Sequence, residues 1–85
     1  MLKVSVISPE QTLFEGEAES VTAPAFDGSL GILTGHAPMV TLLGNGELRL
    51  EGSSAAGGRR FTVEGGFLQV ADDHVRIVTE RAAVV

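Results

Sequence analysis

The sequence predicts a small all-β domain, and three observations carry that prediction. Apolar and polar residues alternate with a period of two in several short segments, as in half-buried strands. Turn residues separate these segments at intervals of about 8 to 12 residues, as in sandwiches and barrels. No segment shows the helical period over more than one turn. We therefore expect one antiparallel β-sandwich or barrel that occupies residues 1–85.

The first strand shows the pattern most clearly, because Leu2, Val4 and Val6 alternate with Lys3 and Ser5. Similar alternation predicts strands at residues 47–51, 60–64 and 74–80, and less regular strands are expected at residues 12–16, 19–23, 30–33, 40–43 and 67–71. The last residues, 81–85, could begin a helix, but the segment is too short to be a stable helix alone.

Turn signals fall between these strands. The chain has 11 glycines, which supply the positive φ angles that tight turns need. The expected turns lie at residues 8–9, 27–28, 35–38, 44–46, 52–58, 65–66 and 72–73, and the small residues of 52–58 predict a hairpin tip.

Composition and charge exclude several classes of protein. With 44% hydrophobic and 20% charged residues the chain has a globular composition, and without cysteine it has no disulfide or thiolate site. A net charge of −5 argues against binding nucleic acid or anionic lipid. No apolar run approaches the roughly 20 residues that span a bilayer, and the N-terminus lacks a secretory signal. We expect a cytosolic or peripheral protein that inserts nothing into lipid.

The sequence contains no motif that points specifically to catalysis or to ligand binding. Gly28, Gly31 and Gly35 match neither a dinucleotide fingerprint nor a phosphate loop. His36 is interpreted as a hydrogen-bonding turn residue, with a catalytic role as the less favoured alternative, and His74 as an exposed residue beside Asp72 and Asp73. The sequence therefore predicts no catalytic residue, no cofactor and no metal.

Two further groups of side chains, one acidic and one apolar, can be interpreted without a catalytic or metal site. The carboxylates of Glu15, Glu17 and Glu19 are interpreted as a solvated face, because a calcium loop needs denser oxygen ligands. The apolar residues of 30–33 and 39–43 fit two readings equally well, namely core residues and a surface that binds a protein partner.

The segment GSLGILTGHAP, residues 28–38, resembles the G-x-L-G-I-L-P-G-H-A-P signature of the epsilon subunit of rotary ATP synthases, which is called delta in mitochondria. Residues 6–10 resemble the family's "V-V-S-P-E", and residues 13–18 its "L-F-S/E-G-E-A". Residues 61–70 resemble "F-x-V-S-G-G-F-L-E-V", and residues 75–80 resemble "V-T-V-L-A-D". The resemblance runs in order over nearly the whole chain.

The resemblance implies a flattened ten-stranded antiparallel β-sandwich of two five-stranded sheets. It also implies a non-catalytic rotor subunit in the central stalk of a proton-translocating ATP synthase. Its partners would be the gamma subunit, the ring of membrane c subunits and the catalytic head. The chain would then lie peripherally on the cytoplasmic face of a bacterial plasma membrane and couple rotation of the ring to ATP synthesis.

The resemblance also implies contact residues. We expect the c-ring-facing loop to comprise Asp27, Gly28, Ser29, Gly35, His36, Ala37 and Pro38. The gamma-facing residues would be Ser8, Met39 and Val40.

Three departures from the family pattern bear on function. Thr34 stands where the family usually has proline, so the following turn is expected to be looser, and Ser29 stands where an acidic residue is common. Most members continue into a pair of C-terminal helices, which we expect to be absent here together with their inhibitory role. The alternatives are a free-standing β-sandwich that binds a peptide or small ligand, and a small hydrolase that uses His36.

Overall fold

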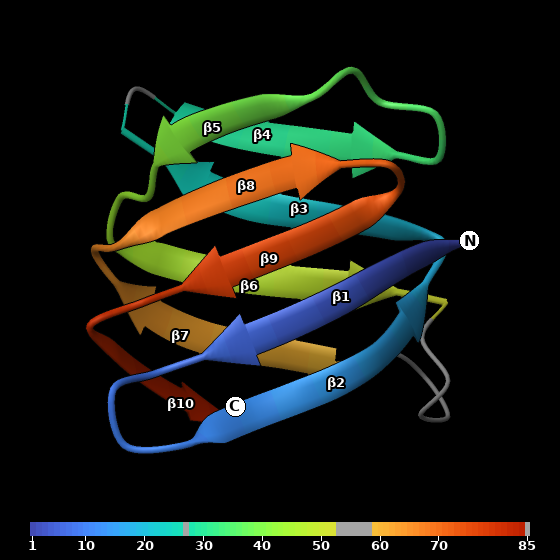
Figure 1. The fold of residues 1–85 in the computed structure, drawn as a ribbon. Helices are drawn as coiled ribbons and strands as arrows, with labels where there is room; N and C mark the ends of the chain where they lie inside the picture. The colour runs from blue at the N-terminus through green and yellow to red at the C-terminus, as the bar shows by residue number, and fades with distance from the viewer. Residues whose placement is uncertain (27, 53–58, 85) are drawn as a thin grey trace.

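The computed structural model describes residues 1–26, 28–52 and 59–84, which fold into ten strands without a helix. Figure 1 shows their order along the chain. The strands are β1 (Leu2–Ile7), β2 (Thr12–Ala18), β3 (Ser20–Ala25), β4 (Gly28–Leu33), β5 (Met39–Leu42), β6 (Gly46–Glu51), β7 (Arg59–Glu64), β8 (Phe67–Ala71), β9 (His74–Val78) and β10 (Arg81–Val84). Every strand expected from the sequence is present within a few residues of its predicted bounds.

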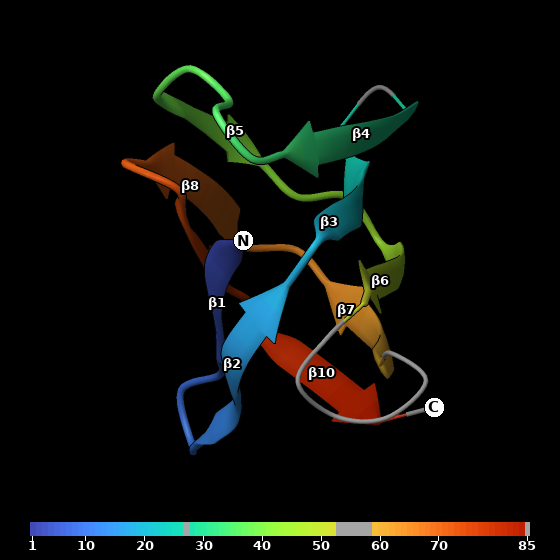
Figure 2. The same ribbon diagram turned by 90° about the vertical axis from the view of Figure 1, so that its right-hand side faces the viewer.

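The strands form two five-stranded sheets that face each other, as Figure 2 shows from the side. Sheet A has the order β2-β1-β9-β8-β5, and sheet B has the order β10-β7-β6-β3-β4. The predicted ten-stranded sandwich is therefore confirmed. In both views β4 and β5 lie at one edge of the sandwich and β2 and β10 at the other.

One detail of the prediction was wrong, because the strands are not all antiparallel. β1 and β9 pair in parallel, with Val4 opposite Val75 and Val6 opposite Ile77. Alternation along a strand shows which face is buried, but it does not show which strand lies alongside. Since about 70 residues separate β1 from β9, no hairpin forces these two strands to run in opposite directions.

The helical alternative for the last residues was also wrong. Residues 81–84 form β10, which pairs with β7 and places Ala82 opposite Val63. Helix propensity is weak in so short a segment, so the free edge of β7 decides its conformation. The predicted hairpin tip at residues 52–58 lies, from residue 53 onward, outside the described residues.

The core lies between the sheets and is built by the alternation that the sequence shows. Side chains on alternate positions are buried in β1, β6, β7, β8 and β9; in β1, Leu2, Val4 and Val6 are at most 1% exposed. Phe61 is the largest fully buried side chain, and its ring meets that of Phe14 edge to face at a centroid distance of 6.3 Å. The core therefore fixes the register of both sheets, since a slip of one residue would turn these side chains outward.

The chain crosses between the sheets at Gly65 and Gly66, which join β7 to β8. Gly66 has a φ of +100°, and a Cβ added there would lie 2.0 Å from the Val78 carbonyl oxygen. The neighbouring Thr79 is 1% exposed, and its hydroxyl lies within hydrogen-bond distance of the carbonyl oxygens of Glu64 (3.2 Å) and Arg81 (3.0 Å). This junction ties the crossing from β7 to β8 to the crossing from β9 to β10.

Candidate functional site

The GHAP loop, residues 35–38, connects β4 to β5 at one end of the sandwich edge. It begins at Gly35, whose φ of +86° favours glycine. The Gly35 N–H donates a hydrogen bond of 2.7 Å to the Asp73 carboxylate (Oδ1). The start of the loop is therefore anchored by a hydrogen bond to a side chain of another segment, the turn between β8 and β9.

His36 has the hydrogen-bonding turn role that the sequence indicated. Its backbone N–H donates to the Leu33 carbonyl at 3.1 Å, and its Nδ1 lies 2.7 Å from the Ala37 carbonyl oxygen. Because a carbonyl oxygen only accepts, Nδ1 carries a proton in this arrangement. One bond joins His36 to the end of β4 and the other stays within the loop, so both shape the loop, and neither links His36 to a nucleophile.

Asp73 is a residue whose role the sequence analysis missed. Asp72 and Asp73 form a two-residue turn with φ values of +49° and +60°, the combination of a type I′ hairpin. The carbonyl of Asp73 accepts the Lys3 N–H at 2.8 Å, while its carboxylate holds Gly35. The Asp-Asp pair between two alternating strands was a signal for the hairpin, but no sequence pattern showed which loop the carboxylate would reach.

The structure divides the expected c-ring-facing residues into two groups. Gly28 and Ser29 begin β4, whereas residues 35–38 follow its other end; Asp27 lies outside the described residues. A six-residue strand is about 17 to 20 Å long, so the two groups occupy opposite ends of one edge strand. Gly28, Ser29, Gly35, Ala37 and Pro38 are exposed, and His36 is half-buried.

The three expected gamma-facing residues are also separated. Ser8 lies in the turn between β1 and β2, where its hydroxyl contacts the Gln11 carbonyl at 3.2 Å. Met39 and Val40 begin β5, at the opposite edge of the same sheet from β2. Met39 is half-buried and packs against the core, whereas Val40 is 68% exposed.

The edge that β4 and β5 share is apolar and uncharged. Val40, Leu42 and Phe67 form an apolar patch on the outer face of sheet A, because Leu42 pairs with Phe67 and Val40 follows two residues away on the same face. Leu33, on β4, is 65% exposed. Although the chain carries 17 charged residues, none falls in residues 28–46. The two interpretations of residues 30–33 and 39–43, core and surface, are each correct for some of the residues. Ile32 and Leu43 belong to the core, whereas Leu33, Val40 and Leu42 are exposed on the surface.

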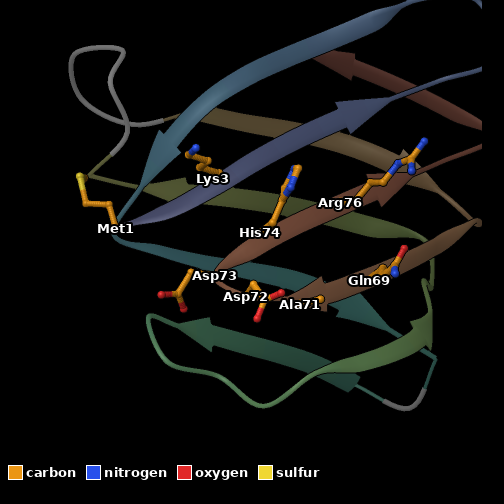
Figure 3. Close-up of a pocket in the computed structure, with 8 residues that line it drawn as sticks. All are labelled: Met1, Lys3, Gln69, Ala71, Asp72, Asp73, His74 and Arg76. Atoms are coloured by element: carbon orange, nitrogen blue, oxygen red, sulfur yellow. The ribbon is translucent and has the colours of Figure 1, made fainter.

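A shallow hollow of about 510 Å³ lies on the outer face of sheet A (Figure 3). The side chains of Lys3, His74 and Arg76 line this hollow, beside the Asp72–Asp73 turn, as Figure 3 shows. The hollow is open and carries charges of both signs, and one of its carboxylates already holds Gly35. It therefore lacks the enclosed, largely apolar lining of a small-molecule pocket.

The Ser5 hydroxyl lies 3.4 Å from Nε2 of His74 on this face. A hydrolytic Ser–His pair needs a third group that orients the imidazole. In the described parts of the chain, no hydrogen bond joins His74 to a carboxylate, and no cluster of three His, Asp or Glu residues is placed to hold a metal ion. Glu15 and Glu17 lie exposed on β2, as a solvated face requires.

The whole chain, residues 1–85, matches the family model described as the ATP synthase delta/epsilon chain, beta-sandwich domain. The chain belongs to this family. Its relatives include the ATP synthase epsilon chains of Rhodopirellula baltica, 45% identical over 99% of this chain, and of Leptospira borgpetersenii, 43% identical over 98%. The match covers 64% of the length of each of these two relatives.

Two solved structures share the fold. A chain in the structure of the Euglena gracilis mitochondrial ATP synthase, comprising OSCP, F1 and the c-ring, superposes with a TM-score of 0.87 at 25% identity; the match covers 98% of this chain and 52% of that one. A chain in the central stalk and c-ring of the Tetrahymena thermophila mitochondrial ATP synthase gives 0.77 at 21% identity, covering 96% of this chain and 65% of that one. The second likeness shows the fold alone. In the described ranges no helix is long and apolar enough to cross a membrane.

Proposed function

We propose that this chain is a non-catalytic subunit of the central stalk of a proton-translocating rotary ATP synthase. It would couple rotation of the c-ring to the gamma subunit and the catalytic head, from a peripheral position on the cytoplasmic face of a bacterial membrane. The match to the family over all 85 residues is the observation that carries this proposal. The relatives named as ATP synthase epsilon chains support it further.

The structure suits a mechanical role. A part that transmits torque needs a stiff body and well-defined contact surfaces. The sandwich supplies the stiff body, because 16 buried apolar residues in the described part of the chain form one cluster. The uncharged edge of β4 and β5 supplies a candidate for the second, because exposed apolar residues gathered in one place mark protein interfaces.

We propose contacts at the residues that the family resemblance implies. We assign Met39 and Val40, with the apolar patch, to the gamma subunit; of this pair Val40 provides the exposed side chain. Ser8 is proposed as a separate gamma contact, since it lies at the other edge of sheet A. For the c-ring to touch both Gly28 and Ser29 and the GHAP loop, the ring would have to lie along the length of β4 rather than against one of its ends.

Calorimetric titration into the purified gamma subunit of the same organism tests the proposal. We expect one-to-one binding that Val40→Asp weakens by about tenfold or more, since a charge would be buried in the contact. Thr62→Asp, at an exposed position of β7 in the other sheet, is the matched control and should bind as the unmodified chain does. Absence of binding to a folded gamma subunit would contradict the proposal and favour a free-standing binding module.

A further inference from the structure

The edge strand β4 has backbone groups that no strand in the described part of the chain uses. β4 is the last strand of sheet B, and among the described strands it pairs only with β3. In an antiparallel pair, successive residues direct their N–H and C=O groups alternately toward the neighbouring strand and away from it. Half of the backbone groups of β4 therefore face the open edge.

Pro24 shows which residues these are. It pairs with Ser29, but it has no N–H, and its carbonyl accepts the Gly44 N–H at 2.8 Å on the side away from β4. The backbone groups of Pro24 and Ser29 thus point away from each other. By alternation Ser29, Gly31 and Leu33 direct their N–H groups to the open edge. Ser29 and Gly31 direct their carbonyls there as well, whereas the Leu33 carbonyl accepts the His36 N–H.

The side chains of β4 do not block its open edge against pairing with another strand. Natural edge strands are usually blocked by charges, prolines or bulges, because unpaired backbone groups recruit other strands. β2 carries Glu15 and Glu17, and β10 carries Arg81. In contrast, β4 has no charge and no proline, and a Cβ added at Gly31 would meet nothing within 4 Å.

We propose that the open edge of β4 binds an extended, uncharged segment of a partner protein as an added strand. The occupant is a peptide backbone, because a row of alternating N–H and C=O groups is complementary to another strand. Its side chains are uncharged, because residues 28–46 of this chain offer no opposite charge to pair with. This inference rests on the proposed function, since it describes how the chain would hold one of its stalk partners.

Hydrogen exchange at single amides tests the inference, with the free chain compared with the chain in the assembled ATP synthase of the same organism. We expect the amides of Ser29, Gly31 and Leu33 to exchange about tenfold or more slowly in the complex, because they gain hydrogen bonds there. The amides of Leu30 and Ile32 face β3, so they are protected already in the free chain and serve as internal controls.

A pair of variants at Gly31 makes the test specific. Gly31→Pro removes one outward N–H without breaking a bond inside the sheet, a change that edge strands tolerate, and should weaken assembly about tenfold. Gly31→Ala keeps the N–H and places its Cβ in open space, so it should assemble as the unmodified chain does. The two variants together separate loss of the donor from loss of glycine.

The outcomes distinguish this inference from the proposed function. If the chain assembles but the three amides exchange as in the free chain, strand addition is wrong and the stalk role stands. If the chain does not assemble with the other subunits, both fail. If the same amides are protected by a second copy of this chain, the assignment to a different protein is wrong.

Discussion

Replacement of Gly66 by alanine is the sharpest test of how the two sheets are joined. The added Cβ would lie 2.0 Å from the Val78 carbonyl oxygen and 2.7 Å from the Thr79 Cα. Both are backbone atoms at the point where the chain leaves β9 for β10. The clash therefore cannot be relieved by a side chain that changes its rotamer. In addition, the φ of +100° is one that residues with a Cβ rarely adopt.

The cost follows from these two effects. Backbone strain in a sparsely populated region costs about 1–3 kcal/mol. Overpacking of a well-packed region costs about 1–3 kcal/mol more. Together they give about 2–6 kcal/mol, a large part of the roughly 4–13 kcal/mol expected for a domain of this size. At about 4–8 °C per kcal/mol, the melting temperature should fall by roughly 8 °C or more.

Thermal and urea denaturation followed by circular dichroism measure this effect. Gly65→Ala is the matched control: Gly65 has a φ of +64°, but the nearest atoms to its added Cβ, those of Glu80, are 3.8 Å away. Its cost should therefore be only the conformational one, about 1–2 kcal/mol. A Gly66→Ala variant as stable as Gly65→Ala would refute the close approach of the two crossings.

Three further predictions follow from other contacts. Asp73→Ala should increase hydrogen exchange at the Gly35 amide and weaken binding of the c-ring, whereas Asp73→Asn, which keeps an acceptor oxygen, should change both far less. Thr79→Val should lower the free energy of unfolding in urea by about 0.5–1.5 kcal/mol, because the carbonyl oxygens of Glu64 and Arg81 lose the hydroxyl that donates a hydrogen bond. The side-chain hydrogen bond from Arg49 lowers the pKa of Glu47, so Arg49→Met should raise that pKa in an NMR titration. Because the folded-state pKa is lowered, the small stabilisation by this pair should be present at neutral pH and disappear as the pH falls through the pKa of Glu47. These predictions fail if the Gly35 amide is unchanged in Asp73→Ala, if Thr79→Val unfolds as the unmodified chain does, or if Arg49→Met leaves the pKa of Glu47 in place.

The strands and turns could be predicted from the sequence because each depends on residues that are close together along the chain. Alternation identifies buried and exposed faces strand by strand, and glycine pairs mark the crossings. The parallel pairing of β1 with β9 could not be predicted in this way, because it depends on how distant segments meet. The conformation of residues 81–84 is decided by pairing with β7 and not by their own preference.

The candidate site was predicted less completely, and for a related reason. The expected c-ring-facing loop grouped Ser29 with His36, but Ser29 lies near the start of β4 and His36 lies beyond its end. Asp73 contacts Gly35 across 38 residues of sequence, so no motif contains both. The open edge of β4 depends on the direction of backbone groups, which the Pro24 pairing reveals only once the register is known.

Proton pumping by the assembled enzyme tests the coupling role most directly. ATP synthase depleted of its own epsilon subunit would be supplied with this chain, and ATP-driven acidification of sealed vesicles would be measured against the rate of ATP hydrolysis. We predict that the chain restores the protons pumped per ATP hydrolysed, and that Val40→Asp restores less at the same concentration. If a folded, saturating chain leaves pumping by the depleted enzyme unchanged, the coupling role is wrong.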